Sequence, residues 1–345
     1  MTTIAPGKKR LRAYLEFLAA ILYYFVALRI ARHSASGVAN EAWMPLVEKA
    51  MLVFLLVTGY STFGYLFDRQ MNPVRQQGFP LREGWMRELG MGLAAGWGFA
   101  VACVLPVALF GGIAIVMTVQ ESAWGWLLAD IAFFALAALA EEMIFRGYGF
   151  QRFEQSVGSA GAVLGFAAFY AIVEMMRPGA NHASLAVSLV VSILLSVSYL
   201  RTRALWLSWG INFGWKASRA LIFGLAVSGV NVHSPVVEGD PMGPFWLTGG
   251  GYGLDGSWVT FFILLLAIPV VYRLTRDLDF LHNAPVLVPG GIPVDLDAAA
   301  RQQHEAATRS AEPPAPVLVQ IGQAPSAPAG ASSPLGPADS HSSSE

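Results

Sequence analysis

The sequence predicts an all-α, polytopic membrane helical bundle of about eight transmembrane helices, followed by a disordered C-terminal tail. Two observations predict this fold class. Of the 345 residues, 55% are apolar and 13% are charged, whereas about 25% are charged in an ordinary soluble domain. The apolar residues also gather into runs of about 20 residues, the length that a helix needs to cross a bilayer. We therefore expect a lipid bilayer as partner. The net charge of -1 provides no field to attract nucleic acid, so we expect no nucleic acid as partner.

Eight charge-poor runs mark the predicted spans. They cover residues 11–31, 50–67, 89–116, 123–146, 159–176, 183–200, 204–227 and 257–274. The first run is interrupted by Glu16 and Arg29, and its apolar stretch also has the length of a signal-peptide core. Because both charges lie near its ends, where a long side chain can reach the membrane interface, we interpret this run as a span.

Basic residues predict the orientation of the bundle. They concentrate in alternate connections, starting from the N-terminal segment, and the positive-inside rule assigns these connections to the cytoplasm. The residues are Lys8, Lys9, Arg10 and Arg12, then Arg69, Arg75, Arg82 and Arg87, then Arg152, then Arg201 and Arg203, and finally Arg273 and Arg276. The opposite connections hold little beyond Arg32, Lys49 and Arg177. We therefore expect a multi-pass protein of the plasma (inner) membrane with both termini in the cytoplasm.

Two segments fall outside the predicted bundle. Residues 81–89 combine Trp85 and Met86 with Arg and Glu residues, which indicates a short interfacial helix before the third span. From about Pro285 onward the chain is rich in Pro, Ala, Ser and Gly, so it cannot bury enough apolar surface to fold. The predicted domains are N-terminal helices with a cytoplasmic loop at 1–80, a core at 81–276 and a disordered cytoplasmic tail at 277–345.

Ionisable side chains inside the spans are the informative positions, because a charge at the bilayer centre costs about 2.5 kcal/mol or more. The ionisable residues are Asp130, Glu141, Glu142 and Arg146 in the fourth run, Glu174 in the fifth, and Lys216 and Arg219 in the seventh, where the polar Asn212 lies on the same helical stripe. Glu142 and Arg146 are four residues apart and can pair on one helix face. At about 1.5 Å per helical residue, Glu141, Glu174 and Asn212 could meet in mid-bundle only with some helix tilt. We interpret Asp130 as a polar residue near an interface.

The fourth run carries a family motif. Residues 141–147 read Glu-Glu-Met-Ile-Phe-Arg-Gly, which resembles the Glu-Glu-x-x-x-Arg signature of the CPBP family, the intramembrane proteases that include the type II CAAX prenyl endopeptidases. Residues 199–207 resemble the segment before that family's third motif, and the similarity extends over about 82–274. The resemblance implies an endopeptidase that hydrolyses peptide bonds of membrane-associated substrates. In such an endopeptidase Glu141 would activate water, and Glu142 with Arg146 would form a supporting pair.

Both motif histidines of that family are replaced in this chain. Where the family has Phe-x-x-x-His, residues 170–174 end in Glu174, and where it has His-x-x-x-Asn/Asp, residues 212–216 begin with Asn212 and end in Lys216. Zinc prefers nitrogen and sulfur ligands, and the single Cys103 lies in an apolar run, so we expect no metal or other cofactor. Asn212 or Lys216 could donate a hydrogen bond to an oxyanion, and the expected substrate is a membrane-tethered peptide or protein.

The same charges permit other functions. The chain could be a catalytically inactive relative that acts as a membrane scaffold or binding protein, held together by a buried ion-pair network. That network would balance Glu141, Glu142 and Glu174 against Arg146, Lys216 and Arg219, with Lys216 neutralising Glu174. A transporter with a proton relay is disfavoured, because the sequence shows neither an inverted repeat nor a matching pair of broken helices.

Overall fold

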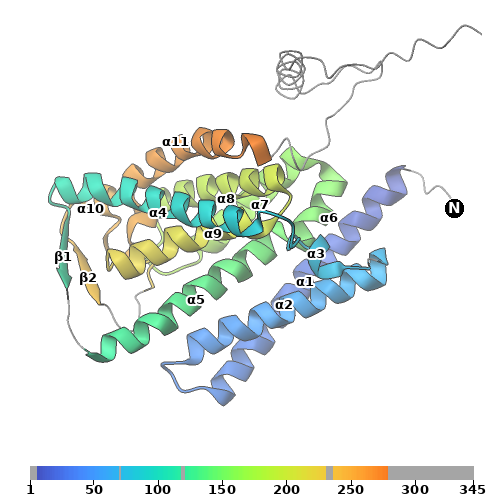
Figure 1. Ribbon diagram of the computed structural model, residues 1–345, viewed down its shortest axis with the longest axis horizontal. Coiled ribbons are helices and arrows are strands. Elements are labelled where there is room, and N and C mark those ends of the chain that lie inside the picture. The colour runs from blue at the N-terminus through green and yellow to red at the C-terminus, as the bar shows by residue number, and fades with distance from the viewer. Residues whose placement is uncertain (1–5, 70, 118–120, 231–235, 279–345) are drawn as a thin grey trace, which may run out of the picture. The chain divides into compact units, whose positions relative to one another are not determined.

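Each of the eight predicted runs contains a helix in the structure, a computed structural model that describes residues 6–69, 71–117, 121–230 and 236–278 (Figure 1). These helices are α1 (Pro6–Val38), α2 (Met44–Asp68), α4 (Trp85–Leu109), α5 (Glu121–Arg146), α7 (Ser159–Met175), α8 (His182–Thr202), α9 (Leu205–Ala217) and α11 (Trp258–Leu274). The all-α membrane bundle predicted from the sequence is confirmed. The predicted tail from Pro285 lies outside the described residues.

The helices differ in their ability to cross a membrane. Five candidates are long and apolar enough: α1, α2, α4, α8, and α5 taken together with the following α6 (Tyr148–Val157). The apolar helices α7 and α11 each have 17 residues, and α9 has 13. At about 1.5 Å per residue, α9 is roughly 20 Å long and is shorter than a hydrocarbon core. Eight crossings and their orientation therefore stay predictions, while the long first helix agrees with a span.

Three predicted boundaries were wrong. The third span ends at Leu109 rather than at residue 116, because the chain turns at Gly111, which adopts a φ of 69°. Residues 81–89 do not form a separate interfacial helix: residues 81–84 are not helical, and Trp85 begins α4. The seventh helix ends at Ala217 and continues only as one π-helical turn, Ser218–Ile222.

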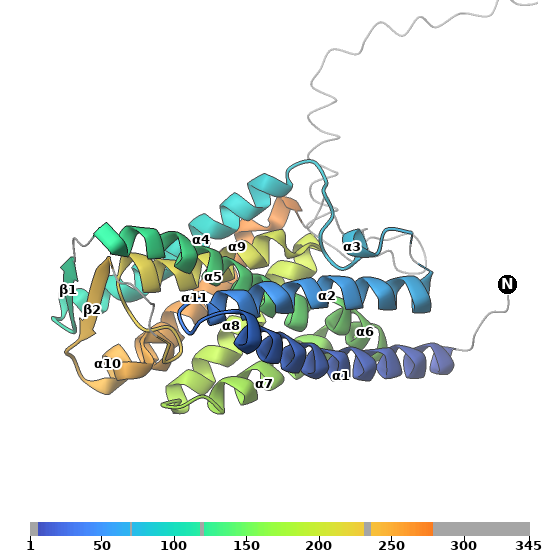
Figure 2. The same cartoon turned by 90° about the horizontal axis from the view of Figure 1, so that it is seen from below.

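The structure contains a short β-ribbon that sequence periodicity did not predict. It lies beyond the ends of the helices. Strand β1 (Ile113–Met117) pairs antiparallel with β2 (Val237–Pro241), and Ile113 lies opposite Pro241. In Figures 1 and 2 the ribbon runs across the end of the bundle, near the end of α4 and the short helix α10 (Phe245–Thr248). The backbone N–H of Gly239 in β2 donates to the Gly224 carbonyl oxygen at 3.0 Å, so the ribbon holds the chain that leaves α9.

Helices α4 and α9 pack backbone against backbone through glycine. Gly92 and Gly96 on α4 form one Gly-x-x-x-Gly motif, and Gly210 and Gly214 on α9 form another. A Cβ atom on Gly210 would lie 2.5 Å from the Leu89 carbonyl oxygen, so these positions have no room for a side chain. Close approach through small residues is a common way for membrane helices to associate. It fixes the rotation of α9.

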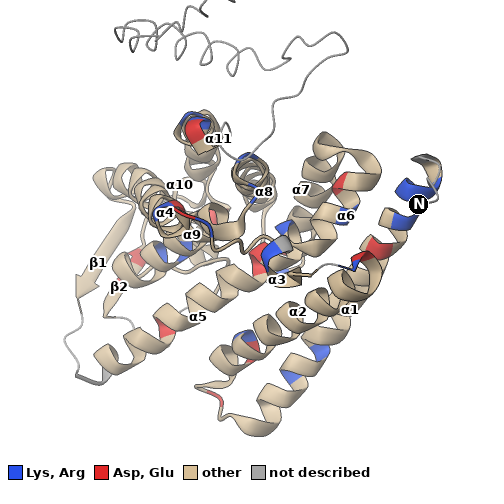
Figure 3. Ribbon diagram, turned by 45° about the vertical axis from the view of Figure 1, so that its right-hand side comes forward, with Lys and Arg blue, Asp and Glu red and all other residues tan. Residues whose placement is uncertain are grey.

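Charges are sparse on the helices and lie mainly near their ends or in the interior (Figure 3). At the end of the bundle where α1 begins, Arg152 of α6 lies 2.6 Å from Asp68 of α2 and 3.5 Å from Glu16 of α1. Glu16 also accepts a 2.7 Å hydrogen bond from Arg12. This cluster holds three helices together, and the break between α5 and α6 at Gly147 turns Arg152 toward it.

Candidate functional site

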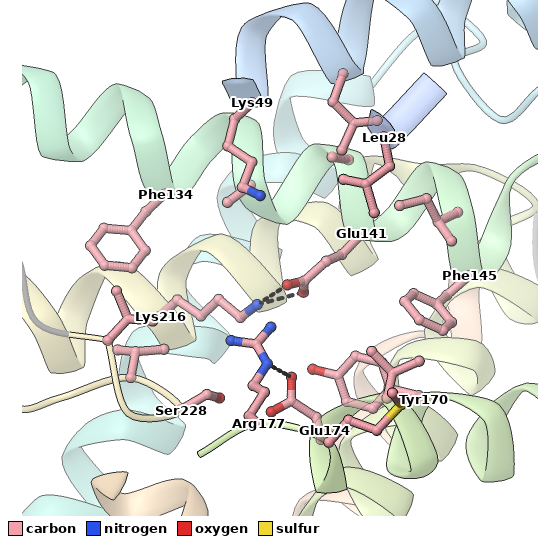
Figure 4. A pocket seen from close by; sticks show the side chains of 18 of the residues that line it. Leu28, Lys49, Phe134, Glu141, Phe145, Tyr170, Glu174, Arg177, Lys216 and Ser228 are labelled. Carbon is pink, nitrogen blue, oxygen red and sulfur yellow. Dashed lines mark hydrogen bonds and ion pairs between the residues drawn. The ribbon is translucent and has the colours of Figure 1, made fainter. Parts of the chain in front are cut away.

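Three of the six predicted site residues, Glu141, Glu174 and Lys216, line a cavity of about 620 Å³ bounded by α1, α2, α5, α7, α9 and the loop 227–230. Apolar side chains line much of it, including Leu28, Leu52 and Phe134, with the basic residues Arg32 and Lys49 beside them on α1 and α2. Another part of the lining, the polar wall, carries charged side chains from α5, α9 and the end of α7, which Figure 4 shows pointing toward one another. These side chains are Glu141, Glu174, Arg177 and Lys216. The cavity therefore combines an apolar surface with a strongly polar one.

Glu141 of α5 lies at the centre of the polar wall. Lys216 Nζ contacts both of its carboxylate oxygens at 2.5 Å, and Asn212 Nδ2 donates to Oε2 at 3.1 Å. The Glu141 side chain keeps 19% of its surface exposed, and Lys216 keeps 11%. Of the three residues that helix tilt could bring together, Glu141 and Asn212 are in contact, and the Glu141 carboxylate faces the cavity.

Glu142 and Arg146 lie behind this wall and outside the cavity lining. Both side chains are fully buried, and Arg146 Nη1 is 3.3 Å from Glu142 Oε1. Arg146 Nη2 also donates to the Ser192 carbonyl oxygen at 3.0 Å and to its hydroxyl at 3.1 Å. Asn212 donates to Glu142 Oε1 at 2.9 Å as well as to Glu141. The predicted Glu142–Arg146 pair is confirmed, and it anchors α5 to α8 and α9.

Glu174 has other partners than the sequence predicted. Its carboxylate lies 3.0 Å from Arg177 Nε, one helical turn further on, and accepts a 2.8 Å hydrogen bond from the Tyr252 hydroxyl. Lys216 pairs with Glu141 instead, so the prediction that Lys216 neutralises Glu174 was wrong. The reason is local: Arg177 lies three residues after Glu174 on the same helix end and reaches it first.

Arg219 also departs from the predicted network. Its acidic partner is Asp255 rather than one of the three glutamates, and Arg219 Nη1 lies 2.6 Å from Asp255 Oδ1. Asp255 in turn accepts hydrogen bonds from the backbone N–H of Ser228 at 3.0 Å and from its hydroxyl at 2.9 Å. This network ties α9 to the loop 227–230 that closes one side of the cavity. Arg219 is therefore a support of the cavity wall.

Part of this chain matches the model of one protein family. Residues 122–218 match the family model described as "Type II CAAX prenyl endopeptidase Rce1-like". That segment is Rce1-like. The matched segment runs from α5 to the end of α9 and contains all six predicted site residues, so the resemblance drawn from Glu141, Glu142 and Arg146 is confirmed. No curated protein and no solved structure matches the chain.

Two residues of the candidate site were missed at the sequence level. Arg177 was assigned only to a loop, although its spacing of three from Glu174 was a usable signal. Figure 4 shows its terminal nitrogens pointing into the cavity toward the Glu141–Lys216 pair. Tyr252 lies beyond the family match and reaches Glu174 across 78 positions, which no local pattern reveals. Asp130 is buried and does not line the cavity.

The described residues that line the cavity include two glutamates and no histidine or cysteine, a donor set that zinc does not prefer. In the described part of the chain, no three His, Cys, Asp or Glu side chains gather into a metal-binding group. The two cavity carboxylates, Glu141 and Glu174, are each paired with a cation, Lys216 or Arg177, that would repel a metal ion. His182, the described histidine nearest to the core motifs in sequence, is exposed at the start of α8.

The Asp255 network predicts a pH dependence of stability. Burial by itself raises the pKa of Asp255, but the Arg219 guanidinium outweighs burial and holds the pKa below its usual value. Because the folded pKa is lowered, the stabilisation is present above the unfolded pKa of about 3.9 and is lost as pH falls through the folded pKa. We expect Asp255→Asn to lower the melting temperature at pH 7, and the gap to the parent protein to narrow below about pH 4. Thermal unfolding in detergent from pH 3 to 8 checks this, and a gap unchanged at pH 3 would contradict it.

Proposed function

We propose that this protein is an intramembrane endopeptidase of the CAAX-protease type, in which Glu141 activates water to hydrolyse a peptide bond of a membrane-tethered substrate. One observation carries the proposal. The first glutamate of the Glu-Glu-x-x-x-Arg motif points into a cavity lined in large part by apolar side chains, keeps 19% of its side chain exposed and has a cation beside it. The apolar lining suits a membrane-tethered segment, and the polar wall suits its peptide bond.

The hydrogen-bond inventory of Glu141 leaves room for water. An ionised carboxylate has about four lone-pair sites. Lys216 uses one on each oxygen and Asn212 uses a second on Oε2, which leaves one on Oε1. A cavity water held there would give its proton to Glu141 as its oxygen bonds to the peptide carbonyl carbon. Glu141 would then pass that proton to the departing amine, so no other reagent is consumed.

Lys216 is the donor that suits the oxyanion. Its ammonium has three N–H groups and spends two on Glu141, which leaves one for the oxygen of the tetrahedral intermediate. Asn212 has two amide hydrogens, and they already go to Glu141 and Glu142. In the proposed mechanism Asn212 is therefore a positioning residue that sets the distance between the two glutamates. No metal takes part in this proposal.

One observation favours a second function. Lys216 contacts both oxygens of Glu141, and an ammonium that close stabilises the ionised carboxylate and weakens it as a base. In that case the cavity would bind a membrane-tethered peptide without cleaving it, as in an inactive relative that acts as a binding protein.

Cleavage of a panel of membrane-tethered peptides by the purified protein in detergent tests the proposal. We expect cleavage by the parent protein and at least about a hundredfold loss in Glu141→Gln, because a general base contributes about that much. The matched control is Glu88→Gln, which removes another buried carboxylate paired with an arginine, Arg82, outside the cavity. Equal cleavage by Glu141→Gln and the parent would refute this mechanism. Peptide binding without cleavage by the parent would establish the second function.

A further inference from the structure

The C-terminal half of α1 carries a surface that the proposed function does not use. On this helix the small residues Ala20, Ala27 and Ala31 are buried, at most 1% exposed. The outward face carries large apolar side chains: Leu22 is 67% exposed, and Phe25 and Val26 are about half exposed. Large apolar groups outside and small ones inside are the arrangement of a helix that faces lipid.

The same face becomes basic toward the end of the helix. Arg29, His33 and Ser36 continue the spacing of Leu22, Phe25 and Val26, so all six lie along one stripe. Arg29, Arg32 and His33, together with Met44 and Glu48 of α2, line an open groove of about 790 Å³. An apolar stripe that ends in a basic groove has the profile of an amphiphile with an acidic head.

The charge balance of the groove favours an anion. Glu48 lies 3.5 Å from Arg32 and 3.2 Å from Lys49, so this one carboxylate serves two cations. Arg29 also lines the groove, so its two arginines leave one positive charge in excess of Glu48, and Lys49, which contacts Glu48 from outside the groove lining, adds a second. Arg32 keeps 60% of its side chain exposed, so its guanidinium can reach a ligand while it holds Glu48.

We propose that this groove binds the phosphate headgroup of an anionic phospholipid, with its acyl chains along Leu22, Phe25 and Val26. Guanidinium groups bind phosphate through paired hydrogen bonds, and a basic residue near a membrane surface favours anionic lipid. Arg32 also lines the central cavity, so the bound headgroup lies next to that cavity's edge. The site is independent of whether Glu141 is catalytic.

Binding measured on the full-length protein by native mass spectrometry tests this site. The probes are phosphatidylglycerol, phosphatidylcholine with the same acyl chains, and glycerol phosphate. We expect phosphatidylglycerol to bind more tightly than phosphatidylcholine, and glycerol phosphate, which lacks chains, to bind far more weakly. Arg29→Gln with Arg32→Gln should weaken phosphatidylglycerol by about fivefold per arginine and leave phosphatidylcholine unchanged.

The control variant removes the same amount of positive charge from a different part of α1. Lys9→Gln with Arg10→Gln removes two exposed cations from the other end of α1 and should leave binding in the groove unchanged. Arg29→Lys with Arg32→Lys should retain much of the preference for phosphatidylglycerol. Equal binding of the two phospholipids, or a preference that survives Arg29→Gln with Arg32→Gln, would overturn the proposal. Tight binding of glycerol phosphate would replace it with a site for soluble anions.

Discussion

Replacing Gly92 and Gly96 together by alanine is expected to destabilise the bundle severely. A Cβ atom at either position would overlap a backbone oxygen of α9, that of Leu207 or of Ile211. Backbone oxygens within a helix cannot move aside singly, so α4 and α9 must separate. Overpacking of this kind costs about 1–3 kcal/mol for each site, and separation also removes the support of Asn212 and Lys216.

The same helix offers a control with the opposite sign. Gly90 and Gly98 are also on α4, but nothing lies within 4 Å of a Cβ atom placed there. Alanine at these two positions is expected to stabilise the helix slightly, by about 0.5–1 kcal/mol each, because glycine is a poor helix former. Both effects are measured by unfolding the parent protein and the two double alanine variants in detergent and monitoring the folded fraction by size-exclusion chromatography. Similar stabilities for the two double variants would contradict the backbone packing of α4 on α9.

Replacing Arg146 by methionine is expected to cost about 3–5 kcal/mol of unfolding free energy. The substitution leaves Glu142 with no cation in a site that is fully buried, and it removes the two hydrogen bonds to Ser192. Asn212 would remain as a donor to Glu142, but one amide cannot compensate a buried charge. The loss is much larger than that of any surface ion pair.

Two further variants separate the buried charge from simple loss of packing. Glu142→Gln in the Arg146→Met background should recover part of the stability, because no charge is then left buried. Arg32→Met makes the same side-chain change at an exposed pair with Glu48 and should cost about 1 kcal/mol or less. Denaturant unfolding in detergent measures all three. If Arg146→Met cost no more than Arg32→Met, the pair would have no structural importance.

Much of the fold follows from the sequence because its causes are local. A run of about 20 apolar residues forms a helix wherever it enters a bilayer, since every backbone polar group must be satisfied within the segment. The Glu142–Arg146 pair is equally local, because residues four apart share one face of a helix. The Glu-Glu-x-x-x-Arg motif at 141–146 was sufficient to indicate the family that residues 122–218 match. The locations of the helices, and the family motif that begins at Glu141, could thus be predicted from the sequence.

The partners between helices were decided only by the tertiary structure. Lys216 pairs with Glu141 rather than Glu174, and Arg219 pairs with Asp255, because the glycine contact with α4 sets the rotation and depth of α9. Each residue turns a helix by about 100°. Hydropathy therefore predicts that a helix lies in the bilayer but does not determine which of its faces contacts which neighbouring helix. Arg177 and Tyr252 became part of the site by the same route, through the end of α7 and a distant loop. The sequence determined which charges enter the membrane, and packing determined which of them meet.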